Sequence, residues 1–209
     1  MKEQCIKESR NRKNELLTIA IKLFAEKGYH KTKISDIVKE AEVSQGTFYW
    51  YFKSKEAIAL EIIQEGQHKL TGVISQGYRR EFATTQDAVK ASEKLFFEIF
   101  TFAEENRFLM ELLLKGLEGE SSIVLAINET KFKLERAFQK NIERAMQLQM
   151  LSNSNNAHMS AALLMSMIEG IIARWLFYPS FSDEFILQQS PEKLAKEVAT
   201  FEFYGLLGN

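Results

Sequence analysis

The chain is poor in the residues that make turns and covalent cross-links. It has two prolines, ten glycines and one cysteine among 209 residues. Because Pro and Gly dominate turns, their low number favours long helices over all-β folds, which need many turns. Cys5 has no second cysteine to pair with, so an intrachain disulfide is excluded and a reducing, cytoplasmic setting is expected.

Uninterrupted apolar runs are also missing. The polar start of the chain, MKEQCIKESRNRK, predicts no secretory signal peptide. The most apolar stretch, residues 159–177, is interrupted by Glu169 and Arg174. The sequence therefore predicts no membrane span and no membrane partner.

Net positive charge, which would point to a nucleic-acid partner, is absent from the chain as a whole but present in one part of it. The formal net charge is −1. Residues 1–55 hold 12 Lys and Arg against 7 Asp and Glu, whereas the remainder holds 15 against 21. This asymmetry favours a basic, DNA-contacting N-terminal part, although a solvated surface would carry the same charges.

Helical periodicity runs through most of the sequence. Residues 15–27 place apolar side chains at Leu16, Ala20, Leu23 and Phe24, and Gly28 supplies a stop signal. Further helices are predicted at 54–75, 86–105, 107–117, 123–151, 157–178 and, after Pro191, to about residue 207. No alternating strand pattern is present, so the predicted fold class is all-α.

Two short helices separated by about three residues are predicted over 35–52, which is the plan of a helix-turn-helix. Ser35 suits the N-cap of the first helix. Phe48 and Phe52 lie four apart and predict the buried face of the second helix. Its opposite face would meet the major groove, where a Gln45 side chain is able to bind adenine through two hydrogen bonds.

Three aromatic residues in a row follow on this second helix. Tyr49, Trp50 and Tyr51 cannot all face one core, so at least one of them is expected to be exposed, and tyrosine hydroxyls bond phosphates. The alternatives are that Trp50 packs on helix 15–27 and that both tyrosines are partly buried. Lys55 in the first turn of the next helix is unfavourable for that helix's dipole, but would complete a phosphate site.

From Gly28 to Ile58 the chain resembles the tetracycline-repressor (TetR) family of regulators. The family pattern has a glycine, a threonine four residues on, a short helix ending in Ala-Gly-Val-Ser, then Gly-x-x-Tyr-x-Tyr-Phe and a lysine. The matching positions are Gly28, Thr32, Ala41, Val43, Ser44, Gly46, Tyr49, Tyr51, Phe52 and Lys55. One position departs: Glu42 stands where the family has glycine, and a non-glycine residue is uncommon there if the turn has a positive φ.

The resemblance implies which residues contact DNA. Thr32, Tyr51 and Lys55 would bind phosphate, with Lys53 beside them. Residues lining the groove would be Ser44, Gln45, Gly46, Thr47, Tyr49 and Trp50. Lys31, Lys33 and the segment 10–13 either add phosphate contacts or are simply solvated.

The resemblance also implies an N-terminal DNA-binding domain, 1–55, and a helical domain, 56–209, that binds an effector and dimerises. Residues proposed for the dimer interface are Ala162, Ser166, Gly170, Leu194, Val198 and Phe201; the alternative is an intrachain core. Effector-pocket candidates, chosen by residue type, are Phe96, Phe100, Phe108, Met110, Leu113, Phe132, Met165, Glu169 and Arg174. A bundle core would contain the same apolar residues, and Glu169 and Arg174 would serve either the ligand or the dimer.

Signatures of catalysis are missing from the sequence. It contains no HExxH, CxxC or phosphate-binding glycine loop, and its three histidines are far apart, so no enzyme, metal or cofactor is expected. By resemblance, the predicted function is a homodimeric transcriptional repressor. It would leave a near-palindromic DNA operator when a small, lipophilic effector binds. The alternative is a helical ligand-binding or protein-interaction module without DNA binding.

Overall fold

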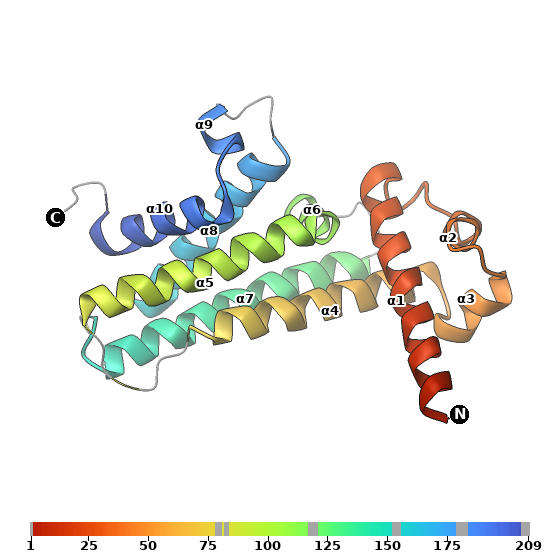
Figure 1. The fold of residues 1–209 in the computed structure, drawn as a ribbon, viewed down its shortest axis with the longest axis horizontal. Coiled ribbons are helices and arrows are strands. Elements are labelled where there is room, and N and C mark those ends of the chain that lie inside the picture. The colour runs from red at the N-terminus through yellow and green to blue at the C-terminus, as the bar shows by residue number, and fades with distance from the viewer. Residues whose placement is uncertain are drawn as a thin grey trace. The chain divides into compact units, whose positions relative to one another are not determined.

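The computed structural model describes residues 2–77, 81, 84–116, 121–151, 156–178 and 184–205, and for residues 2–8 it describes the backbone alone. Every regular element in these ranges is a helix, which confirms the predicted all-α class (Figure 1). The helices are α1 (Lys2–Lys27), α2 (Ile34–Glu40), α3 (Gln45–Tyr51), α4 (Lys55–Ser75), α5 (Thr85–Glu105), α6 (Arg107–Lys115), α7 (Ser121–Gln147), α8 (Ala157–Leu176), α9 (Glu184–Leu187) and α10 (Pro191–Tyr204).

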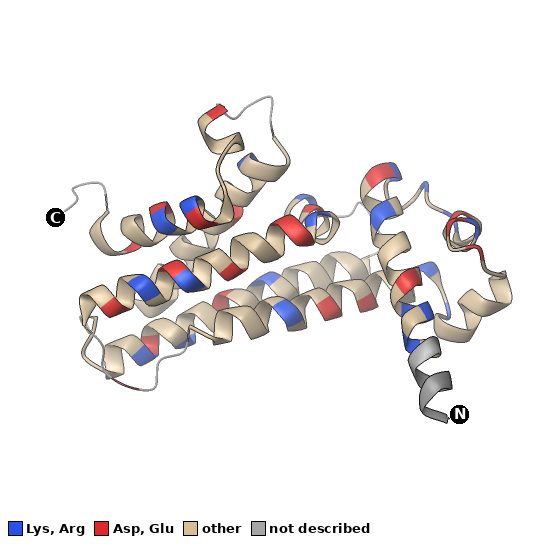
Figure 2. Cartoon of the chain, viewed as in Figure 1, with Lys and Arg blue, Asp and Glu red and all other residues tan. Residues whose placement is uncertain are grey.

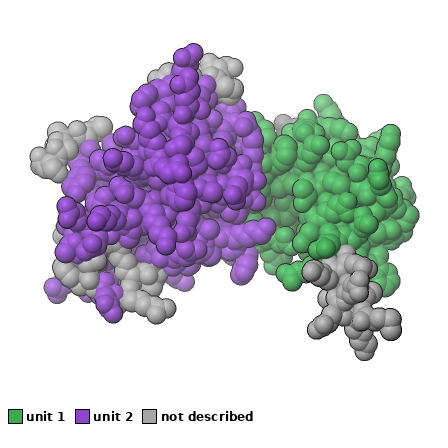
Figure 3. All heavy atoms as spheres, in the orientation of Figure 1, with its two compact units in different colours: residues 1–66, 108–129 green, residues 67–107, 130–209 purple. Residues whose placement is uncertain are grey.

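The chain forms two compact units, coloured separately in Figure 3. Unit 1 comprises residues 1–66 and 108–129, and unit 2 comprises 67–107 and 130–209. The predicted boundary at residue 55 therefore differs from the observed division. The reason is that α4 packs closely on α6 within unit 1: a Cβ atom added at Gly66 would lie 2.6 Å from a methyl carbon of Leu109.

Helix α1 supplies much of the core of unit 1. It begins at Lys2, well before the predicted start at residue 15, and ends before Gly28, whose φ is +85°. Leu16, Ala20 and Phe24 are buried on one face, as the helical periodicity predicts. That face packs on α2, so α1 supports the helix-turn-helix.

The start of α2 differs from the prediction. The N-cap is Lys33, and Ser35 lies inside the helix. The backbone N–H of Lys33 donates to the carboxylate of Asp36 over 2.9 Å. That bond satisfies an N–H that would otherwise lack a partner at the helix end, so the acidic residue sets the start of α2.

Glu42 lies in the turn between α2 and α3 with φ +52°, in the left-handed region. The Val43 N–H reaches back to the Val38 carbonyl over 3.0 Å and closes the turn. The turn therefore does have a positive φ at the one position where the sequence departs from the family pattern. Glu42 is exposed and its side chain has room, so the cost of this residue lies in its backbone conformation.

Unit 2 is a helical bundle in which α10 packs along α5 (Figure 1). Both helices begin at capped residues. The Ser190 hydroxyl accepts from the Lys193 N–H, with Pro191 in the first turn as predicted. The Thr84 hydroxyl donates to Asp87 over 2.6 Å, and this hydrogen bond lowers the pKa of the Asp87 carboxyl.

Helix α8 is apolar yet largely uncovered. Its length and its mean hydropathy of 1.4 would suffice to cross a membrane, and a third of that window is buried. Trp175 packs edge-on against Phe100 of α5, with ring centroids 6.1 Å apart. Glu169 forms an ion pair with Lys131 of α7 over 3.5 Å. These contacts are typical of one face of a bundle helix, and the other face is left exposed.

Replacing Glu42 with glycine is expected to raise the free energy of unfolding by up to about 1 kcal/mol, because a Cβ atom in the left-handed region costs about 1–2 kcal/mol and glycine's greater chain entropy offsets part of the gain. Chemical denaturation measures the change. Glu42→Ala, which removes the charge and keeps the Cβ atom, should leave stability within about 0.5 kcal/mol. Equal stabilisation by both variants would assign the effect to charge and contradict a backbone origin.

Candidate functional site

The second helix of the helix-turn-helix, α3, presents an uncharged outer face (Figure 2). At its start Gln45 and Gly46 are exposed. Further along, 53% of Tyr49 and 82% of Trp50 are exposed. The alternative in which Trp50 packs on α1 is therefore wrong.

The inner face of α3 is anchored by two phenylalanines. Phe48 and Phe52 are 0% and 2% exposed, and their ring centroids lie 5.7 Å apart. Ile37 and Ala41 of the preceding helix and turn are also buried, and α2 contacts α3. This confirms the predicted division of α3 into an anchored face and an exposed face.

Ser44 caps α3. Its hydroxyl oxygen accepts from the Thr47 N–H over 3.1 Å and lies 3.0 Å from the Thr47 hydroxyl. The two side chains therefore hold each other at the start of α3, where sequence reasoning places groove contacts. The cap keeps the first turn of α3 rigid while Gln45 stays exposed.

Tyr51 and Lys53 lie at the other end of α3. The Tyr51 hydroxyl is 3.2 Å from the Ser9 hydroxyl of α1, and the tyrosine is half-buried. Lys53 is exposed. The ammonium group of Lys53 is thus accessible to a phosphate oxygen. The Tyr51 side chain is oriented by its contact with Ser9 of α1.

The predicted phosphate contact by the Thr32 side chain is wrong. Thr32 is 0% exposed, and its hydroxyl donates to the carbonyls of Leu23 and Gly28 at 3.1 and 2.9 Å. Its N–H also donates to the Gly28 carbonyl. Because both polar groups are bonded inside the protein, Thr32 fixes the connection between α1 and α2.

Lys55 is likewise engaged with this connection. Its ammonium group donates to the backbone carbonyls of Tyr29 and Thr32 at 2.7 and 3.0 Å. The same group lies 4.2 Å from the centroid of the Tyr29 ring, within cation–π distance. The first turn of α4 is therefore joined to the segment that precedes α2.

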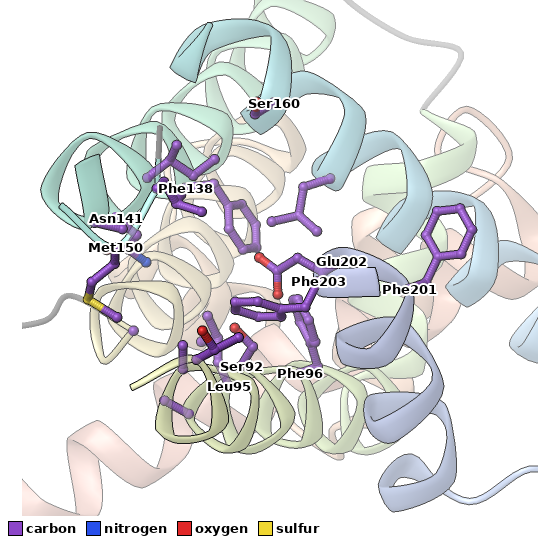
Figure 4. Close-up of a pocket in the computed structure, with 18 of the residues that line it drawn as sticks. Ser92, Leu95, Phe96, Phe138, Asn141, Met150, Ser160, Phe201, Glu202 and Phe203 are labelled. Atoms are coloured by element: carbon purple, nitrogen blue, oxygen red, sulfur yellow. The ribbon is translucent and has the colours of Figure 1, made fainter. Parts of the chain in front are cut away.

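Unit 2 contains a cavity of about 900 Å³ (Figure 4). It is bordered by α5, α7, α8 and α10. Aromatic rings from three of these helices surround it, and the figure shows the Glu202 carboxylate directed into it. Named lining residues include Ser92, Leu95, Phe96, Phe138, Asn141, Leu164, Glu202 and Phe203.

Of the residues predicted to form the effector pocket, Phe96 lines the cavity. Phe100 is fully buried against Trp175, so it belongs to the core. Phe132 points outward with 60% of its surface exposed. The prediction that Phe100 and Phe132 line the effector pocket is therefore wrong, because the rotation of each helix about its axis directs both side chains elsewhere.

The remaining pocket candidates also lie elsewhere. Three of them belong to unit 1 and do not line this cavity: Phe108, Met110 and Leu113. On α8, Met165 is half-buried and Arg174 exposed, and neither lines the cavity. Glu169 is paired with Lys131, so the ligand role predicted for it is not supported.

Several cavity residues were missed by sequence reasoning. Phe138 and Phe203 stand out in the sequence only as apolar residues of helices. Ser92 is 7% exposed and Figure 4 shows it beside the cavity, but a serine within an amphipathic helix gives no signal of such a place. Asn141 donates to the Ile74 carbonyl of α4 over 2.8 Å, a contact that the sequence does not reveal.

Among the described residues, no group of three or more His, Cys, Asp or Glu side chains is arranged to hold a metal ion. The residues with chemical interest are therefore those of α3 and of the cavity.

Residues 16–62 match the family model described as "Bacterial regulatory proteins, tetR family". The match covers α1, the helix-turn-helix and the start of α4. The DNA-binding segment of this chain, residues 16–62, belongs to the tetR family. The chain is a DNA-binding transcription regulator, and the alternative of a helical module without DNA binding is not supported.

One curated relative of similar length supports this assignment, and two solved structures share the fold. The chain is 28% identical over 202 residues to an uncharacterized HTH-type transcriptional regulator, YvdT, of Bacillus subtilis, covering 93% of this chain and 95% of the relative. The fold of this chain matches that of the fatty acid degradation regulator FadR from Bacillus halodurans with a TM-score of 0.78 at 18% identity, over 95% of this chain and 97% of the other. FadR from Bacillus subtilis, solved in complex with stearoyl-CoA, matches with a TM-score of 0.74 at 19% identity, over 92% and 98%.

Two of the residues predicted for the dimer interface are buried within unit 2. Leu194 and Val198 of α10 are 6% and 3% exposed, on a helix that packs along α5. The intrachain alternative is therefore right for both. Phe201 is 46% exposed, so it remains available at the surface.

The small residues of α8 that were predicted for the dimer interface are more exposed than Leu194 and Val198. Ser166 and Gly170 are exposed, and Ala162 is half-buried. Met159 and Leu163 on the same side of the helix are 57% and 65% exposed. We use the name α8 face for the surface formed by Met159, Ala162, Leu163, Ser166 and Gly170, which recur at helical spacing.

Proposed function

We propose that this regulator is a homodimeric repressor that binds a near-palindromic operator and leaves it when a small lipophilic effector occupies the cavity of unit 2. The observation that carries the proposal is the division of α3 into a buried phenylalanine pair and an exposed face of polar and aromatic residues. Two such helices, one per subunit, would enter successive major grooves about 34 Å apart. Dimer symmetry would then be mirrored in the operator.

The exposed face of α3 supports reading of base edges. Gln45 stands in the first turn with its amide exposed, and an amide binds adenine through a donor and an acceptor together. Tyr49, one turn further along α3, and Lys53, beyond its other end, are also exposed. Their hydroxyl and ammonium groups suit phosphate oxygens. Trp50 would make apolar contact in the groove.

The α8 face supports dimerisation. Small residues allow a second helix to approach closely, and exposed methionine and leucine side chains on the same face supply apolar area to bury. Phe201 and Tyr204 of α10 add exposed aromatic surface. We propose that the α8 face and these two aromatics meet the same surface of a second copy.

The cavity supports an apolar effector. Its volume of about 900 Å³ lies within the range of small-molecule sites, and its lining is chiefly aliphatic and aromatic. A hydrocarbon chain or a hydrophobic drug would match this lining. The structural relative from Bacillus subtilis was solved with stearoyl-CoA, and the acyl chain of that compound belongs to this class of ligand.

Helix α4 offers a route from effector to DNA. It begins at Lys55, directly after the helix-turn-helix, and near its other end the Ile74 carbonyl accepts from Asn141, which lines the cavity. A shift of α4 on effector binding would change the separation of the two α3 helices. For this to release DNA, the effector must bind the released form more tightly than the DNA-bound form.

DNA binding is tested by a gel shift with duplexes from the region beside the gene, repeated across salt concentrations. Affinity should fall linearly on a log–log plot as salt rises, because binding releases counterions. Tyr49→Ala should weaken binding about tenfold through a lost groove or phosphate contact. Phe185→Ala, at an exposed aromatic of α9, is the matched control and should bind normally. Absence of binding to every flanking duplex at low salt would contradict the proposal.

Dimerisation through the α8 face is tested by Gly170→Arg. Nothing lies within 4 Å of a Cβ atom at this glycine, so the variant should fold, but a long charged side chain would block a second copy. Sedimentation velocity should show a monomer. The control is Gly72→Arg on α4, another exposed glycine with open space, which should remain dimeric. A dimeric Gly170→Arg protein would place the interface elsewhere.

Effector binding in the cavity is tested by Ala91→Trp. Ala91 lines the cavity on α5, so an indole there would occupy space that the effector needs. Affinity for the neutral fluorescent lipophile N-phenyl-1-naphthylamine should fall about tenfold, given a cost of about 1–3 kcal/mol for poor fit. Lys94→Trp, at an exposed position of α5 outside the cavity, should bind the probe normally. Equal binding by both variants would exclude this cavity as the site.

A further inference from the structure

Lys55 carries a positive charge at the N-terminus of a helix, where the helix dipole destabilises a cation. Lys55 is the first residue of α4, at the positive end of the helix dipole. It is half-buried, so water stabilises its ammonium group less than that of an exposed lysine. A cation retained in such a place requires nearby electronegative groups that stabilise it.

The structure supplies those groups from a single short segment. The carbonyl oxygens of Tyr29 and Thr32 accept from the ammonium group at 2.7 and 3.0 Å. The π face of Tyr29, a residue that is 3% exposed, lies 4.2 Å from the same nitrogen. Three electronegative partners thus lie around the charge, and all three belong to two buried residues, Tyr29 and Thr32.

That segment is itself rigid. Gly28 opens it with φ +85°, and the buried Thr32 hydroxyl bonds the carbonyls of Leu23 and Gly28. The next residue, Lys33, is the N-cap of α2. A group bonded to the Thr32 carbonyl is therefore bonded to the start of α2.

The bond from Lys55 to Thr32 joins residues 23 apart in sequence and closes a loop. The closed loop contains α2, the turn at Glu42 and all of α3. Its two ends are the start of α2 and the start of α4. Closing a loop in this way limits the orientations open to the helices inside it.

We propose that Lys55 is a positioning residue, which sets the orientation of α3 by closing this loop, and that the phosphate contact expected at this end of α3 is made by the exposed Lys53. The proposal rests on operator binding by the regulator, as proposed above. Moving the Lys55 ammonium group to a DNA phosphate would break its hydrogen bonds to two part-buried carbonyls, which is costly. Lys53 carries no such bond in the described part of the chain.

The test compares Lys55→Met with Lys53→Met in the full-length protein. Affinity is measured against a duplex from the region beside the gene that binds the wild type, and against a scrambled duplex of equal length and composition. For Lys55→Met we expect operator affinity to fall about tenfold while affinity for the scrambled duplex is unchanged, because misoriented helices lose base contacts and keep phosphate contacts.

The salt dependence separates the two lysines. Each lost phosphate contact lowers the slope of log affinity against log salt by about 0.9, so a dimer loses about two units. Lys53→Met should show this loss with both duplexes, and Lys55→Met should keep the wild-type slope. A slope reduced by about two in Lys55→Met would overturn the proposal, as would unchanged operator affinity, which would mark the residue as merely structural.

A measurement on the wild-type protein covers the case in which Lys55→Met does not fold. The ammonium protons of a lysine held by two carbonyls exchange slowly with water, so NMR should detect the Lys55 NH₃⁺ signal without DNA. Appearance of that signal only after DNA is added would overturn the proposal. Failure of the wild type to bind any flanking duplex would instead contradict operator binding, and this NMR result would still stand.

Discussion

The buried contact between Phe48 and Phe52 holds in place α3, the helix that we propose recognises DNA. Because these two rings anchor one side of α3, the other side is free of the core and carries Gln45, Tyr49 and Trp50. A helix of seven residues is too short to be stable alone, so tertiary packing holds it in shape. The reading face of α3 is therefore as well ordered as the packing behind it.

A network of backbone contacts complements this anchor. The Thr32 hydroxyl donates to the Leu23 carbonyl in α1, and the Asp36 carboxylate accepts from the Lys33 N–H at the start of α2. The Lys55 ammonium group joins α4 to the Thr32 carbonyl in the segment between α1 and α2. Each of these side chains is polar, and each forms a hydrogen bond with a backbone group of the protein. The family pattern around the helix-turn-helix thus combines residues that face DNA with residues that hold the helices in place.

Unit 2 leaves two apolar regions unfilled, and each has a different consequence. The cavity is bordered by helices of one unit, so a small molecule is able to fill it without any change in assembly. The α8 face is exposed, so covering it requires another surface. Leu163 of the α8 face also lines the cavity, so the surfaces proposed for ligand binding and for dimerisation adjoin each other on the same bundle, and α8 belongs to both.

The sequence by itself determined the helical class, the helix-turn-helix and the Phe48 and Phe52 anchors, because these follow from local periodicity and spacing. Only the tertiary structure decided that Thr32 and Lys55 bond carbonyls and that Phe96 lines the cavity while Phe100 and Phe132 do not. The physical reason is that residue type shows whether a side chain is apolar or charged. Which neighbour it meets depends on how each helix is rotated and packed against helices distant in sequence.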